Sequence, residues 1–230
     1  MKIGGLQHTS LLDYPDCISA IIWTVDCNFR CPFCYNKTLV EGTAPLIAEE
    51  DIFAFLRKRK GVLEALVISG GEPLLQKDIV PFIQKVKKLD YLVKIDTNGS
   101  RPDVLEDLLK QDLVDYVSMD VKAPKNKYEK LTGVKTDISA IQRSITLIME
   151  KAKGYEFKTT FVPNLLKKED IVSIAKWLEG TQNYYLQQVK TDVPLLSTTY
   201  MSVDPYPKEY LIETLEAIQP YFTTSDLRGA

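Results

Sequence analysis

Short apolar segments that alternate with helical patterns set the strongest limit on the fold of this 230-residue chain. Each segment is rich in β-branched and aromatic residues and ends in a polar turn, which is typical of a β-strand. The amphipathic patterns between the segments predict helices. The predicted strands cover residues 18–25, 65–70, 91–97, 116–121, 155–162 and 183–189. The predicted helices cover residues 47–60, 77–89, 102–111, 138–151, 168–178 and 207–218.

This alternation predicts an α/β fold built from βαβ units with parallel strands. The strands read as nearly continuous apolar runs, so we expect both faces of the sheet to be covered. A Rossmann-type open sheet and a (β/α) barrel both fit. A complete barrel usually needs about 250 residues, so six units favour a partial, open (β/α)6 TIM-like barrel. We expect a single domain over residues 1–230, with a core at about 18–190 and a C-terminal helix at 206–220.

The composition excludes several functional classes. A net charge of −2 argues against a general nucleic-acid binder, which would normally be basic. No apolar run approaches the roughly 20 residues of a membrane span, and the N-terminal stretch lacks the apolar segment of a signal peptide. We therefore expect a cytoplasmic protein without nucleic-acid or membrane partners. Thiols stay reduced in the cytoplasm, so clustered cysteines indicate metal binding or catalysis before disulfides.

Polar and glycine-containing motifs follow the predicted strands at their carboxyl ends. In a parallel sheet or barrel these ends meet at one edge, where the chemistry is placed. In chain order the motifs are CNFRCPFCYN (27–36), SGGEP (69–73), DTNG (96–99), MDVK (119–122), FKTTFVP (157–163) and LQQVK (186–190). Their clustering predicts an active site at this edge.

Three of the four cysteines lie in the first motif, in the pattern Cys27-x3-Cys31-x2-Cys34. Three interpretations are open: small buried side chains, structural zinc, and an iron–sulfur cluster with three protein ligands. Burial does not require this spacing, and structural zinc usually takes four N or S ligands. Cys17 lies at the opposite end of the first predicted strand, and His8 is farther away. The cluster is favoured because three thiolates leave one iron open, and we expect Cys17 to be a small buried residue.

The cysteine loop resembles that of the radical S-adenosylmethionine (SAM) superfamily. GGEP at Gly70–Pro73, the Asp120-x-Lys122 strand end and the open barrel extend the resemblance along the chain. It implies a [4Fe–4S] cluster held by the three cysteines of the loop, with no catalytic side chain beyond these ligands. It also implies that the open iron binds SAM and that the reduced cluster cleaves SAM to a 5′-deoxyadenosyl radical. The chemistry would be the cofactor's, while the protein supplies position and shielding.

The resemblance also implies SAM contacts from the strand-end motifs. Gly70 and Gly71 would let the backbone approach a ligand, unless GGEP is a plain strand-to-helix turn. Glu72 would accept a hydrogen bond from the methionine ammonium group. The carboxylates of Asp96 and Asp120 could converge beside a monovalent cation, since oxygen ligands suit a hard cation, or they could cap helices. The expected cofactor-binding residues are Phe33, Gly70, Gly71, Glu72, Pro73, Asp96, Thr97, Asn98, Asp120, Lys122, Lys158 and Gln188.

Within the superfamily, GGLQHTSLLDYPD (4–16) and the cysteine loop resemble glycyl-radical-enzyme activating proteins, and most closely the activators of anaerobic ribonucleoside-triphosphate reductase. A reduced flavodoxin or ferredoxin would then supply one electron, and the radical would take a hydrogen from a glycine of the partner enzyme. Asp16 and Asp26 stand where this group usually has glycine, and Tyr35 stands where it usually has histidine. No cysteine follows Cys34, which excludes further clusters.

Two questions stay open in the sequence. The alternative function is that of a small-molecule radical SAM enzyme similar to 7-carboxy-7-deazaguanine synthase, which would need a closed pocket instead of an open barrel end. The other question is the role of a run of lysines that either docks an acidic partner or electron carrier or is simply solvated. This run consists of lysines 122, 125, 127, 130 and 135.

Overall fold

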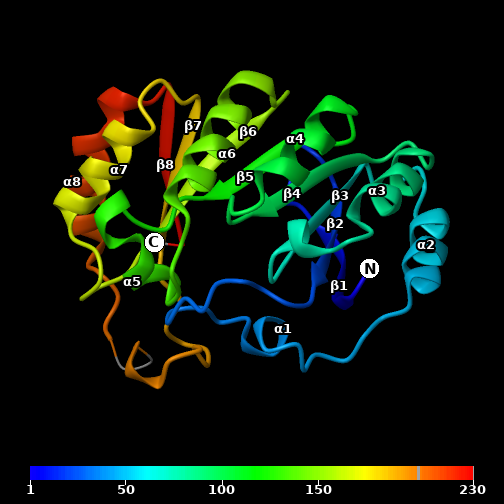
Figure 1. Ribbon diagram of the computed structural model, residues 1–230, viewed down its shortest axis with the longest axis horizontal. Helices are drawn as coiled ribbons and strands as arrows, with labels where there is room; N and C mark the ends of the chain where they lie inside the picture. Colours follow the sequence, from blue (N-terminus) through cyan, green and yellow to red (C-terminus); the bar gives the residue numbers. More distant parts are fainter. Residues whose placement is uncertain (201–202, 230) are drawn as a thin grey trace.

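The computed structural model describes residues 1–200 and 203–229. Its centre is one sheet in the strand order β1 to β8 (Figure 1). β2 to β8 run parallel, and β1 pairs antiparallel with β2. The strands are β1 (Ile3–Ser10), β2 (Ser19–Thr24), β3 (Ala65–Gly70), β4 (Leu92–Thr97), β5 (Tyr116–Asp120), β6 (Tyr155–Phe161), β7 (Asn183–Gln188) and β8 (Thr224–Arg228).

From β2 onward, at least one helix connects each strand to the next strand along the chain. The α-helices are α1 (Lys37–Val40), α2 (Glu49–Lys58), α3 (Ile79–Lys87), α4 (Pro102–Lys110), α5 (Tyr128–Thr132), α6 (Ile138–Lys151), α7 (Lys168–Trp177) and α8 (Lys208–Ile218). The 3-10 helices are η1 (Pro73–Leu75), η2 (Lys125–Lys127), η3 (Thr198–Tyr200) and η4 (Gln219–Tyr221). None of the helices in the described residues combines the length and the apolarity needed to cross a bilayer.

The open α/β sheet of parallel strands expected from the sequence is confirmed. The six predicted strands correspond to β2 through β7, and neighbours along the chain are neighbours in the sheet. β1 and β8 are absent from the sequence-based prediction, and the six-stranded count is therefore wrong. Most side chains of these two edge strands are not buried. A strand that is not buried has no continuous apolar run by which its sequence could reveal it.

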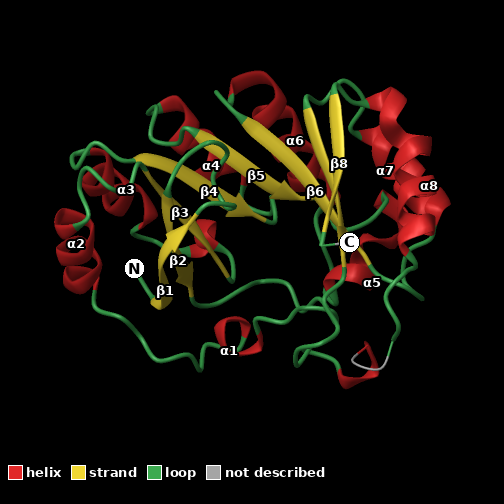
Figure 2. Ribbon diagram, turned by 180° about the vertical axis from the view of Figure 1, so that it is seen from behind, coloured by secondary structure: helices red, strands yellow, loops and turns green. Residues whose placement is uncertain are grey.

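Alternate residues of the central strands form the main core against the helices. Examples are Ile68, Ile95, Met119, Phe157 and Leu186, all of which are fully buried. We call this side of the sheet the outer face. Helices α2 to α4 and α6 to α8 lie along it (Figure 2). The side chains of a strand alternate between faces, so every second residue packs against these helices.

The other face, which we call the inner face, carries charged side chains on β4 to β6, while Ile21 of β2 and Val67 of β3 form a small apolar cluster on it with Tyr14. Lys94, Asp96, Asp120, Glu156 and Lys158 alternate with the core residues of the same strands and line a cavity. The expectation that both faces of the sheet are covered holds for the outer face, whereas much of the inner face lines the cavity. Helices cover only the outer face, and the charged side chains of β4 to β6 lie on the inner face.

A buried carboxylate connects the strands across the inner face. Glu156 on β6 is 0% exposed, and its Oε1 accepts a hydrogen bond from Ser118 Oγ at 2.8 Å. Arg228 on β8 donates to both carboxylate oxygens, at 2.9 and 2.8 Å. Lys94 on β4 lies 3.4 Å from Oε1 and also donates to the Asp13 carbonyl oxygen at 2.6 Å. We call this chain of groups the Glu156 brace, because it joins β8, β6, β5, β4 and the loop after β1.

The brace keeps Glu156 ionised. Burial alone would raise the pKa of this carboxyl, but the hydrogen bonds from Arg228 and the charge of Lys94 outweigh burial and lower its pKa to about 2. A carboxyl with a folded pKa below its unfolded value stabilises the fold above about pH 4.3 and loses this contribution as the pH falls towards the folded pKa.

We expect Glu156→Gln to lower the free energy of unfolding by about 3–5 kcal/mol at pH 7, because it removes the buried carboxylate that pairs with the buried Lys94 and the partly exposed Arg228. Urea unfolding followed by circular dichroism measures the loss. The difference from wild type should shrink as the pH falls from about 5 towards 2, since protonation removes the same charge from wild type.

The matched control is Asp90→Asn, which breaks the exposed pair between Asp90 and Lys60. This pair is screened by solvent and should contribute little. Equal stability of the Glu156→Gln and Asp90→Asn variants would contradict the role of the brace.

Candidate functional site

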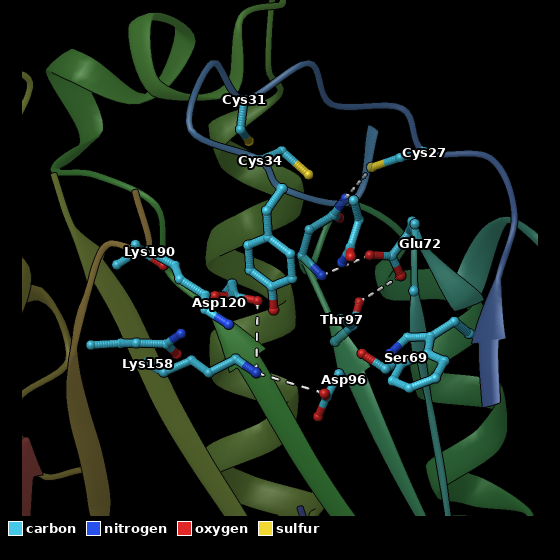
Figure 3. Close-up of a pocket in the computed structure, with 18 of the residues that line it drawn as sticks. Cys27, Cys31, Cys34, Ser69, Glu72, Asp96, Thr97, Asp120, Lys158 and Lys190 are labelled. Atoms are coloured by element: carbon cyan, nitrogen blue, oxygen red, sulfur yellow. Dashed lines mark hydrogen bonds and ion pairs between the residues drawn. The ribbon is translucent and has the colours of Figure 1, made fainter. Parts of the chain in front are cut away.

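Cys27, Cys31 and Cys34 follow β2 and line one cavity of about 630 Å³ (Figure 3). All three are free thiols. Burial raises the pKa of Cys31 to about 12 and that of Cys27 to about 11, so these free thiols are neutral at pH 7. A metal centre that binds them as thiolates must displace their protons, which requires strong soft-metal bonding.

The arrangement of the thiols distinguishes a cluster from a single ion. In the described part of the chain, no three His, Cys, Asp or Glu side chains are arranged to hold one metal ion. Zinc binds each sulfur at about 2.3 Å, so all of its ligands must point at one centre. In an iron–sulfur cluster each thiolate binds a different iron, and the sulfurs lie farther apart. Three thiols that share a cavity without a common centre therefore fit a cluster better than zinc.

Neither the fourth cysteine nor the single histidine lies in this cavity. Cys17, at the other end of β2, is partly buried against Tyr14 and Ile21. It is less buried than the sequence predicts. The His8 ring stacks on Phe55 with the centroids 5.0 Å apart. The donor set at the cavity thus consists of three sulfurs.

Two distant segments hold the cysteine loop in place. The Arg30 amide donates to the Thr132 carbonyl oxygen at the end of α5, at 2.7 Å. Gly133 follows with φ +68°, and a Cβ at this position would lie 2.4 Å from the Arg30 carbonyl oxygen. On the other side, the Leu196 amide donates to the Cys34 carbonyl oxygen at 2.7 Å. Only a residue without a side chain lets α5 approach the loop this closely.

The two aspartates that stand where glycine is usual share an uncommon backbone conformation. Asp16 has φ +58° and Asp26 has φ +75°. Glycine adopts this left-handed region without strain, and aspartate tolerates it better than most residues do. The Asp26 carboxylate pairs with Lys2 at 2.9 Å. Both substitutions therefore keep the backbone shape that glycine would allow.

The glycines of GGEP lie at the end of β3 and contact the backbone of β2 and the cysteine loop. A Cβ on Gly70, which has φ +119°, would lie 2.3 Å from the Thr24 amide nitrogen. A Cβ on Gly71 would lie 2.1 Å from the Asp26 carbonyl oxygen. Both glycines line the cavity, but the space that they leave is taken by the protein's own backbone. Pro73 begins η1 and lies outside the cavity lining.

Glu72 connects the end of β3 to the end of β4. It is 1% exposed, and its Oε1 accepts from the Leu74 amide at 3.1 Å and from Thr97 Oγ1 at 2.8 Å. Its Oε2 accepts from the Asn98 amide at 2.7 Å. Burial raises the pKa of Glu72 to about 7 in spite of these bonds. A carboxylate has about four acceptor positions, so one position remains for a ligand.

Asp96 and Asp120 converge, and neither caps a helix. The ammonium group of Lys158 lies between them, 3.7 Å from Asp96 Oδ2 and 4.0 Å from Asp120 Oδ2 (Figure 3). Lys122 lies 3.2 Å from Asp120 Oδ1. Burial would raise the pKa of Asp120, but Lys122 and Lys158 lower it below its usual value. The carboxylates that would hold a monovalent cation are thus bridged by an ammonium group.

Two buried acceptors in the cavity have no hydrogen-bond partner among the described residues. They are Gln188 Oε1 and Asp96 Oδ1, the second of which lies 3.8 Å from the Lys94 ammonium group, beyond hydrogen-bond distance. The amide nitrogen of Gln188 is fixed, because it donates to the Tyr206 carbonyl oxygen at 2.7 Å. Buried polar atoms normally accept or donate a hydrogen bond, so two acceptors without one in a single cavity favour a ligand with N–H or O–H donors.

The cavity therefore brings together nearly all of the residues predicted from the strand-end motifs. Those that line it are Cys27, Cys31, Phe33, Cys34, Gly70, Gly71, Glu72, Asp96, Thr97, Asn98, Asp120, Lys122, Lys158 and Gln188. Sequence reasoning missed Lys94, Glu156 and Arg228, which also line it. Lys94 and Glu156 are charged residues inside apolar strands, and that signal could have identified them. Arg228 lies on an unpredicted strand and had no such signal.

Comparison with known proteins gives a consistent result. The sequence profile of the Radical SAM superfamily matches residues 21–179. The chain is 39% identical over 196 residues to a protein of Methanocaldococcus jannaschii that is named as a glycyl-radical enzyme activating enzyme. This alignment covers 81% of the chain and 79% of the relative.

Solved structures share the fold. SuiB of Streptococcus suis, solved with bound S-adenosylmethionine, superimposes with a TM-score of 0.71 at 17% identity; the match covers 91% of this chain and 50% of SuiB. A domain of a pyruvate-formate lyase-activating enzyme of Bacteroides vulgatus superimposes with a TM-score of 0.57 at 13% identity, covering 72% of this chain and 99% of that domain. At such low identity these similarities concern the fold alone.

We expect Gly133→Ala to displace the cysteine loop and to lower iron incorporation, because its Cβ would collide with the Arg30 carbonyl oxygen. The matched control is Gly61→Ala. Gly61 also has a positive φ, +85°, but a Cβ there would meet nothing within 4 Å. Both variants should lose about 1 kcal/mol for the left-handed alanine, and only Gly133→Ala should lose more. Iron and sulfide per chain after anaerobic reconstitution, together with urea unfolding, measure the two effects. Equal iron content in both variants would contradict the role of Gly133 in holding the cysteine loop.

Proposed function

The chain belongs to the radical SAM superfamily, and on that premise we propose that it activates a glycyl-radical enzyme. The observation that carries the proposal is the 39% identity, over 81% of the chain, with a relative named for that activity. We further propose anaerobic ribonucleotide reductase as the partner, because the N-terminal GGLQHTSLLDYPD stretch resembles the activators of that enzyme. The proposed location is the cytoplasm, where thiols stay reduced.

The family implies a [4Fe–4S] cluster and SAM, and the donor set of the cavity fits both. Cys27, Cys31 and Cys34 would hold the cluster through three of its irons. When bound, the cluster and SAM supply the one-electron chemistry that removes a hydrogen atom from the partner's glycine. No side-chain acid or base is needed for that step. The remaining residues of the cavity bind and orient SAM and shield the site.

The charges in the cavity suit the amino-acid end of SAM, which carries an ammonium and a carboxylate group. Asp96 and Asp120 offer acceptors to the ammonium group, and Lys122 and Lys158 offer donors to the carboxylate. The orphaned acceptors Asp96 Oδ1 and Gln188 Oε1 support a ligand with donors in this position. The buried ring of Phe33 lines the same cavity and gives an apolar surface for the adenine base.

We assign Glu72 mainly to positioning. Three of its acceptor positions are filled by Leu74, Thr97 and Asn98, so it holds the DTNG turn in place and has one position left for the ammonium group of SAM. The ammonium group of Lys158 lies between the carboxylates of Asp96 and Asp120. Binding of a monovalent cation by these two carboxylates, beside the SAM carboxylate, would require Lys158 to move.

The open sheet suits a protein substrate. β1 and β8 are the two edges of the described sheet, and a loop that carries glycine can enter from the open side. A small substrate would instead favour a closed pocket with convergent polar groups. A reduced flavodoxin or ferredoxin is the proposed source of the electron.

We expect Cys27→Ala, Cys31→Ala and Cys34→Ala each to lose the cluster after anaerobic reconstitution. Cys17→Ala should keep the iron content and the absorption spectrum of wild type, because Cys17 lies at the other end of β2. Iron and sulfide analysis with visible spectroscopy measures both results. Loss of the cluster in the Cys17→Ala variant would show that the ligand set is wrong.

Incubation of the reduced holoprotein with SAM and anaerobic ribonucleotide reductase tests the function. We expect an electron paramagnetic resonance signal of a glycyl radical on the reductase, with one 5′-deoxyadenosine and one methionine formed per radical. The signal should be absent when the acceptor glycine of the reductase is replaced by alanine. If no glycyl-radical enzyme acquires a radical and a pterin is turned over instead, the small-molecule alternative is correct.

A further inference from the structure

Four exposed basic residues lie on the cysteine loop or on segments that contact it, although the chain as a whole is acidic, with a net charge of −2 and an isoelectric point of about 5.6. Arg30, Arg101, Lys130 and Lys135 are all exposed. We call these four residues the basic rim. An acidic partner would be repelled by the overall charge of the chain, so a local positive surface decides where such a partner can bind.

Specific contacts tie each part of the basic rim to the loop. Arg101 follows Ser100, whose Oγ accepts a hydrogen bond from Asn28 Nδ2 at 2.9 Å. Lys130 lies on α5, whose Thr132 carbonyl oxygen accepts from the Arg30 amide at 2.7 Å. Lys135 is two residues beyond Gly133, which abuts the Arg30 carbonyl oxygen. The rim residues therefore belong to the loop and to two segments that contact it.

The charges of the rim are free to act on a partner. Arg30 donates to the carbonyl oxygens of Cys27 and Phe29, at 2.5 and 2.8 Å. Within the described residues, no rim side chain has a carboxylate within 4.0 Å. Nearby cations differ, since Lys127 pairs with Asp170 and Arg143 pairs with Asp103 and Glu106.

Two exposed carboxylates, Glu129 and Asp137, lie in the same stretch. Asp137 is occupied as the N-cap of α6, where its Oδ1 accepts from the Ser139 amide at 2.9 Å. Four cations against two carboxylates leave the rim positive. Of the lysine run at 122–135, Lys122 instead faces the cavity and Lys127 is paired. Lys125 is exposed, but its ammonium group donates to Gln142 Oε1 at 3.2 Å and lies 4.8 Å from the centre of the Trp177 ring. Lys130 and Lys135 are the exposed members of the run that have neither an ion pair nor a side-chain hydrogen bond among the described residues.

None of the four rim residues lines the cavity. The three cysteines line it, whereas Arg30, between Cys27 and Cys31 in the same loop, is exposed outside it. A protein bound to the basic rim would be separated from the cluster ligands by the loop alone, and the cavity would stay open to a substrate. The two partners of an activase can thus bind to different surfaces.

We propose that the basic rim docks an acidic one-electron carrier protein. This inference rests on the proposed function, because the cluster needs one electron for each SAM that is cleaved. The carrier is oxidised by one electron and the bound cluster is reduced by one, with no bond formed or broken between the proteins. Opposite charges accelerate such encounters at low ionic strength.

The test compares Lys130→Glu/Lys135→Glu with the control Lys58→Glu/Lys88→Glu in the reconstituted holoprotein. Lys58 and Lys88 are also exposed, unpaired among the described residues, and at the ends of helices, but they lie on α2 and after α3. Anaerobic stopped flow follows bleaching of the cluster by a reduced, acidic flavodoxin and, separately, by dithionite. We expect the rim variant to be reduced by flavodoxin about tenfold more slowly at low salt, while the control and all dithionite rates stay at wild-type values.

Several results would overturn the proposal. One is a rim variant that flavodoxin reduces as fast as it reduces the control. Another is a loss of dithionite reduction, which would place the damage at the cluster. A third is a rim variant that fails to form the glycyl radical even with dithionite as reductant, which would assign the rim to the substrate protein. Radical formation by wild type with dithionite tests the proposed function separately from the docking surface.

Discussion

The buried carboxylate of Glu156 is the group on which the open sheet depends most. A closed barrel is held by a continuous ring of strand pairs, but here β1 and β8 are the edges of the described sheet. Arg228 reaches Glu156 from β8, where its guanidinium also lies 3.5 Å from the centre of the Tyr185 ring. Lys94 reaches it from β4 and binds the Asp13 carbonyl beyond β1. These side chains cross the inner face, so they can hold the curvature of the sheet and leave its edges open. Burying charges is unfavourable, and mutual pairing offsets that cost.

The parts of the fold that could be predicted from the sequence are those that bury an apolar face. β2 to β7 pack against helices, and this packing leaves apolar runs in the sequence. β1 pairs with β2, and β8 pairs with β7. This pairing uses backbone hydrogen bonds and leaves no apolar pattern in the exposed side chains, so the sequence does not predict it. The same limit applies to Gly133. Its contact with Arg30 joins positions about a hundred residues apart, and no local pattern marks it.

The strand-end motifs predicted which residues meet at the site but not what each of them contacts. Gly70 and Gly71 make room for the backbone of Thr24 and Asp26. Glu72 accepts three hydrogen bonds from other residues of the protein. Spacing along a chain shows that a group lies at the edge of the sheet. It does not show whether the neighbour is a ligand or the next strand. The GGEP motif therefore has a structural role, because it joins the ends of β2, β3 and β4.

Charge around the cysteine loop bears on how easily a bound cluster accepts an electron. A positive charge near the thiolates favours the reduced state, and a negative charge opposes it. Arg30 donates to two loop carbonyls, and Lys122 lies in the cavity below. Asp26, next to Cys27, would act in the opposite sense, but its carboxylate pairs with Lys2 at 2.9 Å. The aspartate is therefore compatible with reduction: its backbone takes the left-handed conformation in which glycine is favoured, and Lys2 compensates the charge that glycine would not have introduced.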